Sequence, residues 1–172
     1  TYAVDSQSGA IRNGAPGVCS GGTTPTVLAV SPGYQNLYVA NQVDKNIVHF
    51  SLADNGVLTN KDTVTLVDPV TAMTVSPDGN SLYVLSGTTT ATLSVFGLSS
   101  GAIGSAPESQ TSLTIPGNAT DLVVPTAITV LPSGKAVYVT AYDKSSYNPG
   151  GSVSSSASPG WLYGFVVGSS GA

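Results

Sequence analysis

Short stretches in which apolar and polar residues alternate recur along the whole chain. Examples are 27–31, 71–76 and 126–131, each rich in Val, Ala, Thr or Leu and each followed directly by a Pro. Alternation with β-branched residues predicts β-strands. Gly, Pro, Asn and Asp separate the stretches and predict turns. No stretch keeps a 3.6-residue apolar period, so the sequence predicts a protein with almost no helix.

The strand pattern is an internal repeat. Segments 25–41, 70–86 and 125–141 align, each with two β-rich runs around a turn that contains Pro. Tyr38, Tyr83 and Tyr138 occupy the same position in the three segments, as do the prolines at 32, 77 and 132. The three tyrosines are 45 and 55 residues apart. Recurrence of aligned segments at spacings of about this length indicates a repeat architecture.

A second element follows each segment. Phe50, Phe96 and Phe165 lie in apolar runs that precede Asn-Gly or Ser-Gly turns, and Tyr2 has the same place at the chain start. A further β-capable run follows these turns within the chain, as at 57–66. The unit is therefore four strands, lettered a to d, at about 26–31, 36–41, 47–52 and 57–66. Four strands recurring every 45 or so residues are typical of a β-propeller blade.

The predicted fold class is all-β, a β-propeller of four-stranded antiparallel blades that forms one domain. Residues 1–24 hold strands c and d of a first blade, and 25–69 and 70–124 are full blades. Residues 125–172 hold strands a to c of a last blade, with a b–c insertion at 142–160. The total is 13 strands, or about three and a quarter blades.

The motifs resemble the YVTN-type, lactonase-like β-propeller repeat family, which has the six-phosphogluconolactonase-like fold. The matching residues are Leu-Tyr-Val-Ala-Asn at 37–41, Ser-Pro-Asp-Gly at 76–79 with Leu-Tyr-Val at 82–84, and Val-Tyr-Val-Thr at 137–140. The resemblance implies a full ring of about seven blades. It also implies a wide functional range, from lactone hydrolases to surface-layer and other secreted proteins.

The strand count does not close a ring, because a propeller needs at least about four blades. Two explanations stay open. The chain is part of a longer propeller, or it completes a ring or filament with further copies of itself. The expected partners are accordingly the missing blades of the same protein or further copies, with a protein or carbohydrate ligand as a further possibility.

Composition narrows the function classes. Only 8% of the residues are charged, the net charge is −4 and the pI is near 4.4, which disfavours nucleic acid and anionic membranes as partners. No apolar run is long enough for a transmembrane segment. Few Lys and Arg with many Ser, Thr and Gly favour an extracellular, periplasmic or cell-surface location. The role of the single cysteine, Cys19, stays open between an unpaired side chain and a bridge to a missing part or a partner.

Strand order predicts which face of the propeller recognises ligands. The a–b and c–d turns share one face, here the turn face, and are short and uniform. The b–c loops and d–a links share the other, here the loop face, and vary in length. Variable loops on a rigid scaffold commonly carry recognition. The candidate ligand-binding residues are Asp44, Lys45, Tyr142, Asp143, Lys144, Tyr147 and Trp161, and Asn118 is a weak candidate for glycosylation.

Few residues of this chain are candidates for hydrolytic catalysis. The family hydrolases are thought to gather Arg, His and Glu near the central channel, and this chain has one of each: Arg12, His49 and Glu108. None falls in an innermost strand a, and His49 is expected to be an ordinary residue of a c strand. The loop carboxylates Asp44, Asp68, Asp121 and Asp143 lack the ligand spacing of a calcium loop.

No nucleophile elbow, phosphate loop or metal-spaced His set is present, so no cofactor, metal or catalytic residue is assigned. The sequence favours a secreted or cell-surface scaffold for binding or assembly. The alternative is a fragment of a lactonase-like hydrolase whose catalytic residues lie in blades outside this chain.

Overall fold

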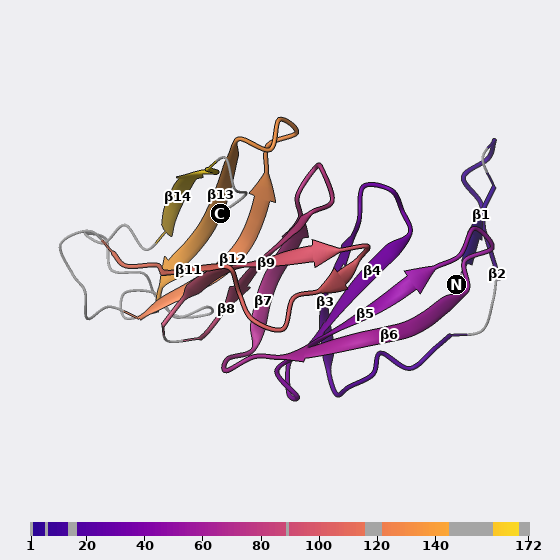
Figure 1. Ribbon diagram of the computed structural model, residues 1–172, viewed down its shortest axis with the longest axis horizontal. Coiled ribbons are helices and arrows are strands. Elements are labelled where there is room, and N and C mark those ends of the chain that lie inside the picture. The colour runs from indigo at the N-terminus through magenta and orange to yellow at the C-terminus, as the bar shows by residue number, and fades with distance from the viewer. Residues whose placement is uncertain are drawn as a thin grey trace.

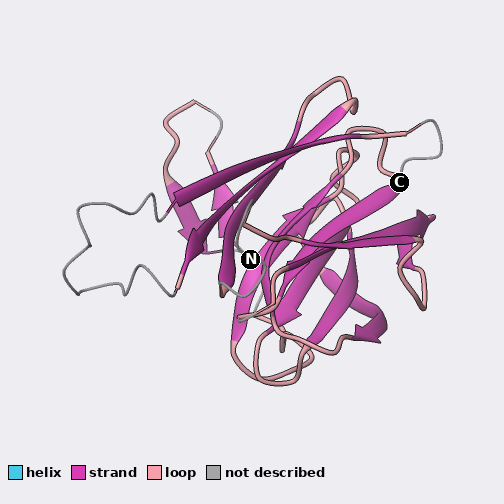
Figure 2. Cartoon of the chain, turned by 90° about the vertical axis from the view of Figure 1, so that its left-hand side faces the viewer, coloured by secondary structure: helices cyan, strands magenta, loops and turns pink. Residues whose placement is uncertain are grey.

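The computed structural model describes residues 2–5, 7–13, 17–88, 90–115, 122–144 and 160–168, which form strands, turns and loops without a helix (Figures 1 and 2). The all-β prediction is therefore confirmed. In chain order the strands are β1 (Tyr2–Val4), β2 (Ile11–Asn13), β3 (Pro25–Val30), β4 (Asn36–Asn41), β5 (Asn46–Leu52), β6 (Leu58–Thr65), β7 (Val70–Val75), β8 (Ser81–Ser86), β9 (Thr92–Ser99), β10 (Ala102–Ile103), β11 (Ser109–Ser112), β12 (Val123–Val130), β13 (Ala136–Asp143) and β14 (Gly160–Val166).

The strands form four antiparallel sheets that follow the repeat. We call them the first blade (β1–β2), the second (β3–β4–β5–β6), the third (β7–β8–β9 with β10 and β11) and the fourth (β12–β13–β14). Strands β3, β7 and β12 are the a strands, and β7 lies between the other two. The blades thus succeed one another along the molecule, with the three a–b turns along one edge (Figure 1).

The same irregularity recurs in each a strand. The pairing register with the b strand shifts between Pro25 and Val27, between Val70 and Ala72, and between Pro125 and Ala127. The residue inside each shift is a threonine, and the hydroxyls of Thr71 and Thr126 donate to carbonyls of the neighbouring strand. The threonine that recurs at 26, 71 and 126 in the three aligned segments is therefore the extra residue of a β-bulge.

The outer strand of the third blade departs from the repeat. The sequence predicts one β-capable run after Gly101, whereas the structure has two short strands, β10 and β11, which both pair with β9. Pro107 lies between them and has no N–H to give to a ladder. The Glu108 N–H donates to the Val95 carbonyl at 2.8 Å and restarts the pairing.

The start of the long insertion is also different from the prediction. Residues 142–160 are expected to be a loop, but β13 continues through Tyr142 and Asp143, which pair with Val124 and Val123 of β12. The a strand of this blade begins earlier than in the other blades, and its two extra valines supply partners for the longer b strand. Asp143 is therefore a strand residue and is buried.

Two apolar cores hold the blades together. One lies between the second and third blades and contains Tyr38, Ile47, Val84 and Phe96, and the other lies between the third and fourth and contains Tyr83 and Val139. Each core takes one face of each of two neighbouring sheets. Burial between blades, rather than within one, is what makes stacked repeats stable.

Candidate functional site

The loop face is organised by hydrogen bonds between each b–c loop and its neighbouring d–a links. Backbone N–H groups of Gln42, Leu66 and Gly87 donate to the carbonyls of Thr24, Lys45 and Pro69, and Lys144 donates to Leu122 in the same way. These bonds measure 2.7–3.1 Å. Loops and links therefore lie together on one face, as the strand order predicts.

Asp44 and Lys45 brace this loop face. The Asp44 carboxylate accepts a hydrogen bond from the Thr23 N–H at 2.5 Å, and the Lys45 Nζ donates to the Val67 carbonyl at 2.9 Å. Gly22 packs so closely that a Cβ there would lie 2.7 Å from Asp44 Oδ2. In this arrangement both charged side chains hold the links that enter and leave the second blade.

The candidates on the last blade form a separate group. Tyr142 and Asp143 end β13, Lys144 follows them, and Trp161 on β14 pairs with Ala141. The Trp161 Nε1 is buried and has no hydrogen-bond partner among the described residues. The third blade stands between this group and Asp44 with Lys45, so the structure does not join them in one site. Tyr147, Asn118 and Asp121 lie outside the described residues.

Arg12, His49 and Glu108 lie in three different places. Arg12 is on β2 opposite Ala3, and Glu108 lies beside Gly97, where a Cβ would meet its carboxylate oxygen. His49 is buried in β5. Among the described residues no three His, Cys, Asp or Glu side chains gather as metal ligands. Among the described residues, the segments that carry Arg12, His49 and Glu108 therefore do not place them at one site.

His49 nevertheless belongs to a part-buried network of polar side chains. Its Nδ1 is 2.7 Å from Asp62 Oδ2, and its Nε2 is 2.8 Å from Asn36 Oδ1. The ring stacks on Tyr38, with 5.2 Å between the ring centroids. In the third blade the aligned positions of β8, β9 and β11 are Ser81, Val95 and Ser109. The polar network of Asn36, His49 and Asp62 is therefore an addition to the repeat, and the propeller fold does not require it.

The polar network extends to the third blade. The Tyr38 hydroxyl donates to the Gly101 carbonyl at 2.8 Å, and the Ile103 N–H donates to Asp62 Oδ1 at 3.3 Å. Burial and the nearby Asp62 carboxylate raise the pKa of Tyr38 to about 12. Gly101 has φ +87°, and a Cβ there would strike the Asn36 amide. The c–d turn of the third blade is therefore fitted against the second blade.

A polar hollow of about 760 Å³ opens on the turn face between these two blades. The sequence predicts ligand recognition on the loop face and does not predict this hollow. Asn36 and His49 stand where the third blade has Ser and Val, and this break in the repeat is a signal in the sequence that points to it. The lining includes Asn36, Asp54, Asp78, Asn80, Ser100 and Gly101.

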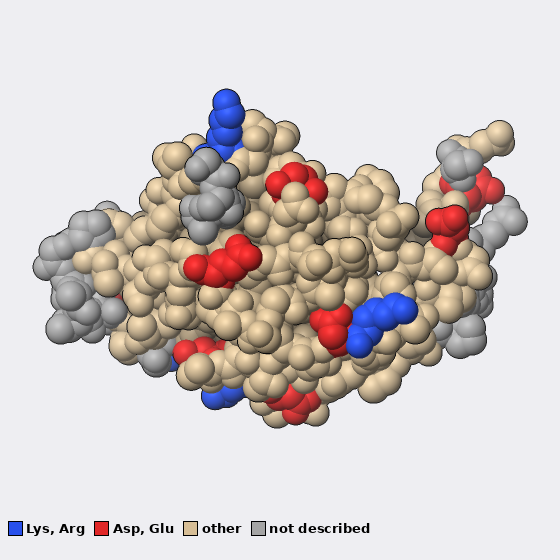
Figure 3. Space-filling view, in the orientation of Figure 1, with Lys and Arg blue, Asp and Glu red and all other residues tan. Residues whose placement is uncertain are grey.

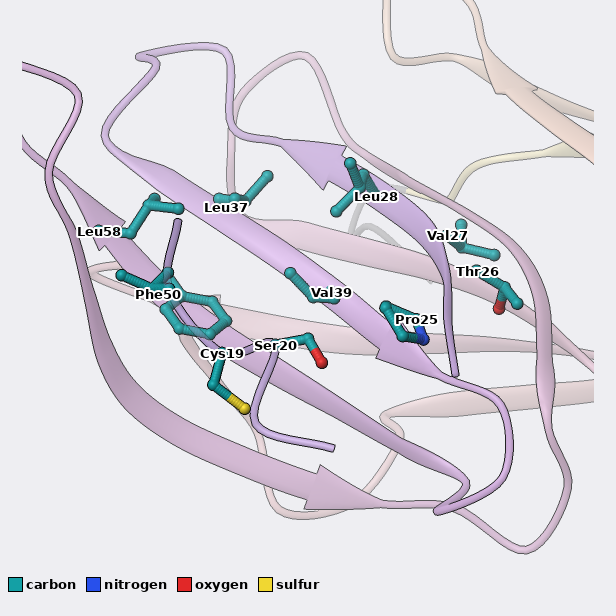
Figure 4. A pocket seen from close by; sticks show the side chains of 11 residues that line it. Cys19, Ser20, Pro25, Thr26, Val27, Leu28, Leu37, Val39, Phe50 and Leu58 are labelled. Atoms are coloured by element: carbon teal, nitrogen blue, oxygen red, sulfur yellow. The ribbon is translucent and has the colours of Figure 1, made fainter. Parts of the chain in front are cut away.

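An apolar pocket of about 410 Å³ lies on the second blade, on its face away from the third (Figure 4). Leu37, Val39 and Phe50 form its floor, and the link that carries Cys19 and Ser20 borders it. Cys19 is exposed and unpaired among the described residues.

Charge on the surface is sparse. Figure 3 shows Lys, Arg, Asp and Glu singly or in small groups on a mostly uncharged face. In the part of the chain that the structure describes, no helix is long and apolar enough to cross a membrane.

No family model matches the chain, and no curated protein does. Solved structures do match. A putative 6-phosphogluconolactonase from Bacteroides uniformis has 16% identity and a TM-score of 0.64, and the match covers 95% of this chain and 50% of that one. The periplasmic gluconolactonase of Pseudomonas aeruginosa has 18% identity and a TM-score of 0.60, and the match covers 83% of this chain and 45% of that one. A functionally unknown protein from Desulfotomaculum acetoxidans has 18% identity and a TM-score of 0.64, and the match covers 84% of this chain and 47% of that one.

These likenesses show the fold, which is that of the lactonase-like β-propellers. The chain spans about half the length of the structures that it matches. The YVTN-type repeat rests on the sequence motifs themselves.

Proposed function

We infer that these blades act as a scaffold for binding or assembly in a secreted or cell-surface β-propeller. The observation that carries the inference is the repeated tyrosine. Tyr38 is 0% exposed and Tyr83 is 3% exposed, whereas Tyr138 is 39% exposed. The same residue in the same strand position is buried wherever the described structure holds the following blade.

The exposed surface around Tyr138 is mostly apolar, and Thr129 and Thr140 are the exposed polar side chains beside it. Leu162 and Val166 lie on the same side of β14 as Gly164, which pairs with Tyr138, and they are 70% and 88% exposed. We call Tyr138, Leu162 and Val166 the C-terminal blade face. Contiguous exposed apolar side chains mark interaction surfaces. A further blade of the same repeat fits this face, supplied either by more of the same protein or by another copy.

Ligand contacts in this proposal lie on the loop face, at Asp44, Lys45, Tyr142, Lys144 and Trp161. Asp143 is buried and is not retained, and Tyr147 stays a candidate from the sequence alone. Two groups of loops on a rigid framework suit a broad ligand such as a protein or a carbohydrate polymer. Asp44 and Lys45 are held in place by hydrogen bonds to Thr23 and Val67, and Lys144 is exposed.

The second candidate is a lactonase-like hydrolase whose catalytic residues lie in blades outside this chain. It is favoured by the fold, because solved structures of the same fold include a putative 6-phosphogluconolactonase and a gluconolactonase. Ring opening of a simple sugar lactone by the purified protein would favour this candidate over the scaffold.

Measurement of the molar mass of the 172-residue protein by light scattering tests the proposal that the protein assembles through the C-terminal blade face. We expect a concentration-dependent rise in mass that Leu162→Ser weakens about tenfold or more, since burying one leucine contributes about 2 kcal/mol. Val67→Ser is the matched control, because Val67 is highly exposed but lies in a link away from the C-terminal blade face. A monomer at all concentrations, or equal weakening by both variants, would argue against assembly through this face.

A further inference from the structure

The apolar pocket of the second blade occupies a position that the repeat defines. Leu28, Leu37, Val39 and Phe50 line it. Their counterparts in the third blade are Met73, Leu82, Val84 and Phe96, and all four lie in the core that also contains Tyr38. In the fourth blade they are Ile128, Val137, Val139 and Phe165, in the core that contains Tyr83. At both interior interfaces, this surface receives a tyrosine from the b strand of the preceding blade.

On the second blade the surface receives no such side chain from the described residues, and Leu28 is 65% exposed. In the described residues the first blade consists of β1 and β2, and Tyr2 of β1 aligns with Phe50 of a c strand. These two strands therefore correspond to c and d, and strands a and b of this blade are not among the described strands. In the other blades the a strands pack against one another, so a hairpin of a and b strands would lie directly over the pocket.

We propose that the pocket is the seat of a tyrosine carried by a β-hairpin of this repeat, which adds to the edge of β1 and completes the first blade. The inference deepens the proposed function by naming the partner of the face opposite to the C-terminal blade face. Strand addition supplies backbone hydrogen bonds, and the pocket supplies specificity for one side chain. The apolar lining, with no charged residue, suits the aromatic ring.

The repeat also identifies a hydrogen bond for the incoming side chain. Tyr38 donates to the Gly101 carbonyl in the c–d turn of the blade that receives it. The counterpart of Gly101 in the second blade is Gly56, and the two turns share a left-handed glycine, with φ +87° and +79°. The hydroxyl of the incoming tyrosine accordingly donates to the Gly56 carbonyl.

The experiment adds the hairpin to the full chain. A second copy of residues 70–94, which comprise the hairpin, its b–c connection and the start of the c strand, is placed ahead of Thr1, so that the effective concentration is high. Cys19 borders the pocket and is the only cysteine, so its rate of reaction with a thiol reagent reports occupancy. We expect the added hairpin to slow this reaction about tenfold and to raise the melting temperature. The matched control is the same extension with Tyr83→Ser in the added copy, which should protect Cys19 much less.

An unchanged Cys19 rate, or equal protection by the two extensions, would overturn the proposal. Protection of Cys19 in the unextended chain that grows with protein concentration would also overturn it, because a second copy would then be the occupant. The readout does not involve Tyr138, Leu162 or Val166. A negative result in this experiment would therefore not decide the light-scattering test of assembly through the C-terminal blade face.

Discussion

At the residue scale, the repeated tyrosine shows how one side chain takes its properties from what packs on it. Tyr38 lies over His49, Tyr83 pairs with Val95, and the ring of Tyr138 covers Gly164. Their positions could be predicted from the alignment alone. The stacking of Tyr38 on a histidine and its bond to Gly101 could not, because both depend on residues that the repeat pattern treats as variable.

Tyr38 predicts an alkaline loss of stability. Its pKa is about 12 in the folded protein against an ordinary value near 10, because burial and Asp62 disfavour the phenolate. The folded state thus binds the proton more tightly, and the free energy of unfolding should fall as the pH rises from 10 to 12. The loss from this group is about 3 kcal/mol at most, at 1.36 kcal/mol per pH unit.

Denaturant unfolding at pH 8, 10 and 11 measures this loss. Tyr38→Phe should flatten the pH dependence and lower stability at pH 8 by about 1 kcal/mol through loss of the hydrogen bond to Gly101. Tyr138→Phe is the control that also removes one tyrosine, and it should keep the steep dependence. If the two variants behave alike, Tyr38 is not the group responsible.

At the element scale, the a–b turns combine a rule with an exception. Gly79 and Gly134 take φ +77° and +71°, and each N–H donates to the carbonyl three residues earlier. In the second blade the same position is Tyr34, with φ +57° and the same hydrogen bond. The turns were predictable from Pro and Gly, and Pro-Gly-Tyr-Gln also predicts a turn. The left-handed tyrosine was not predictable, because the glycine is shifted by one residue.

Exchange of these residues should change stability in opposite directions. Tyr34 is 76% exposed, so Tyr34→Gly loses little packing and relieves the left-handed backbone, which should raise the free energy of unfolding by about 1 kcal/mol. Gly79→Ala introduces the same conflict and should lower it by about 1 kcal/mol. Thermal and denaturant unfolding of both variants would measure the difference, and a Tyr34→Gly protein less stable than the parent would contradict the argument.

At the scale of the whole molecule, protection should follow the stacking of blades. Strands β4, β5, β8 and β9 lie in sheets that pack against a neighbouring blade, whereas β1–β2 is a two-stranded sheet and β14 leaves Leu162 and Val166 exposed. Opening of a terminal repeat breaks one interface only.

Hydrogen exchange would test this gradient. We expect amides of β8 and β9 to exchange at least about 100-fold more slowly than those of β1 and β14, a ratio equivalent to about 2.7 kcal/mol. Addition of a hairpin to the first blade, as proposed above, should slow exchange in β1 and leave β14 unchanged as an internal control. Uniform protection across the strands would show instead that the molecule opens as a single unit.

The sequence by itself determined most of the strands, their grouping into sheets and the order of the sheets, because alternation and turn residues are local and the repeat supplied three copies of each signal. It did not predict the divided outer strand of the third blade or the extension of β13 through Asp143. Only the tertiary structure decided which tyrosine is covered, that Asp62, His49 and Asn36 meet, and that a hollow opens on the turn face. Those features arise where side chains distant in sequence are packed together across two sheets. Their burial and pairing depend on the neighbouring blade, which no single strand pattern contains.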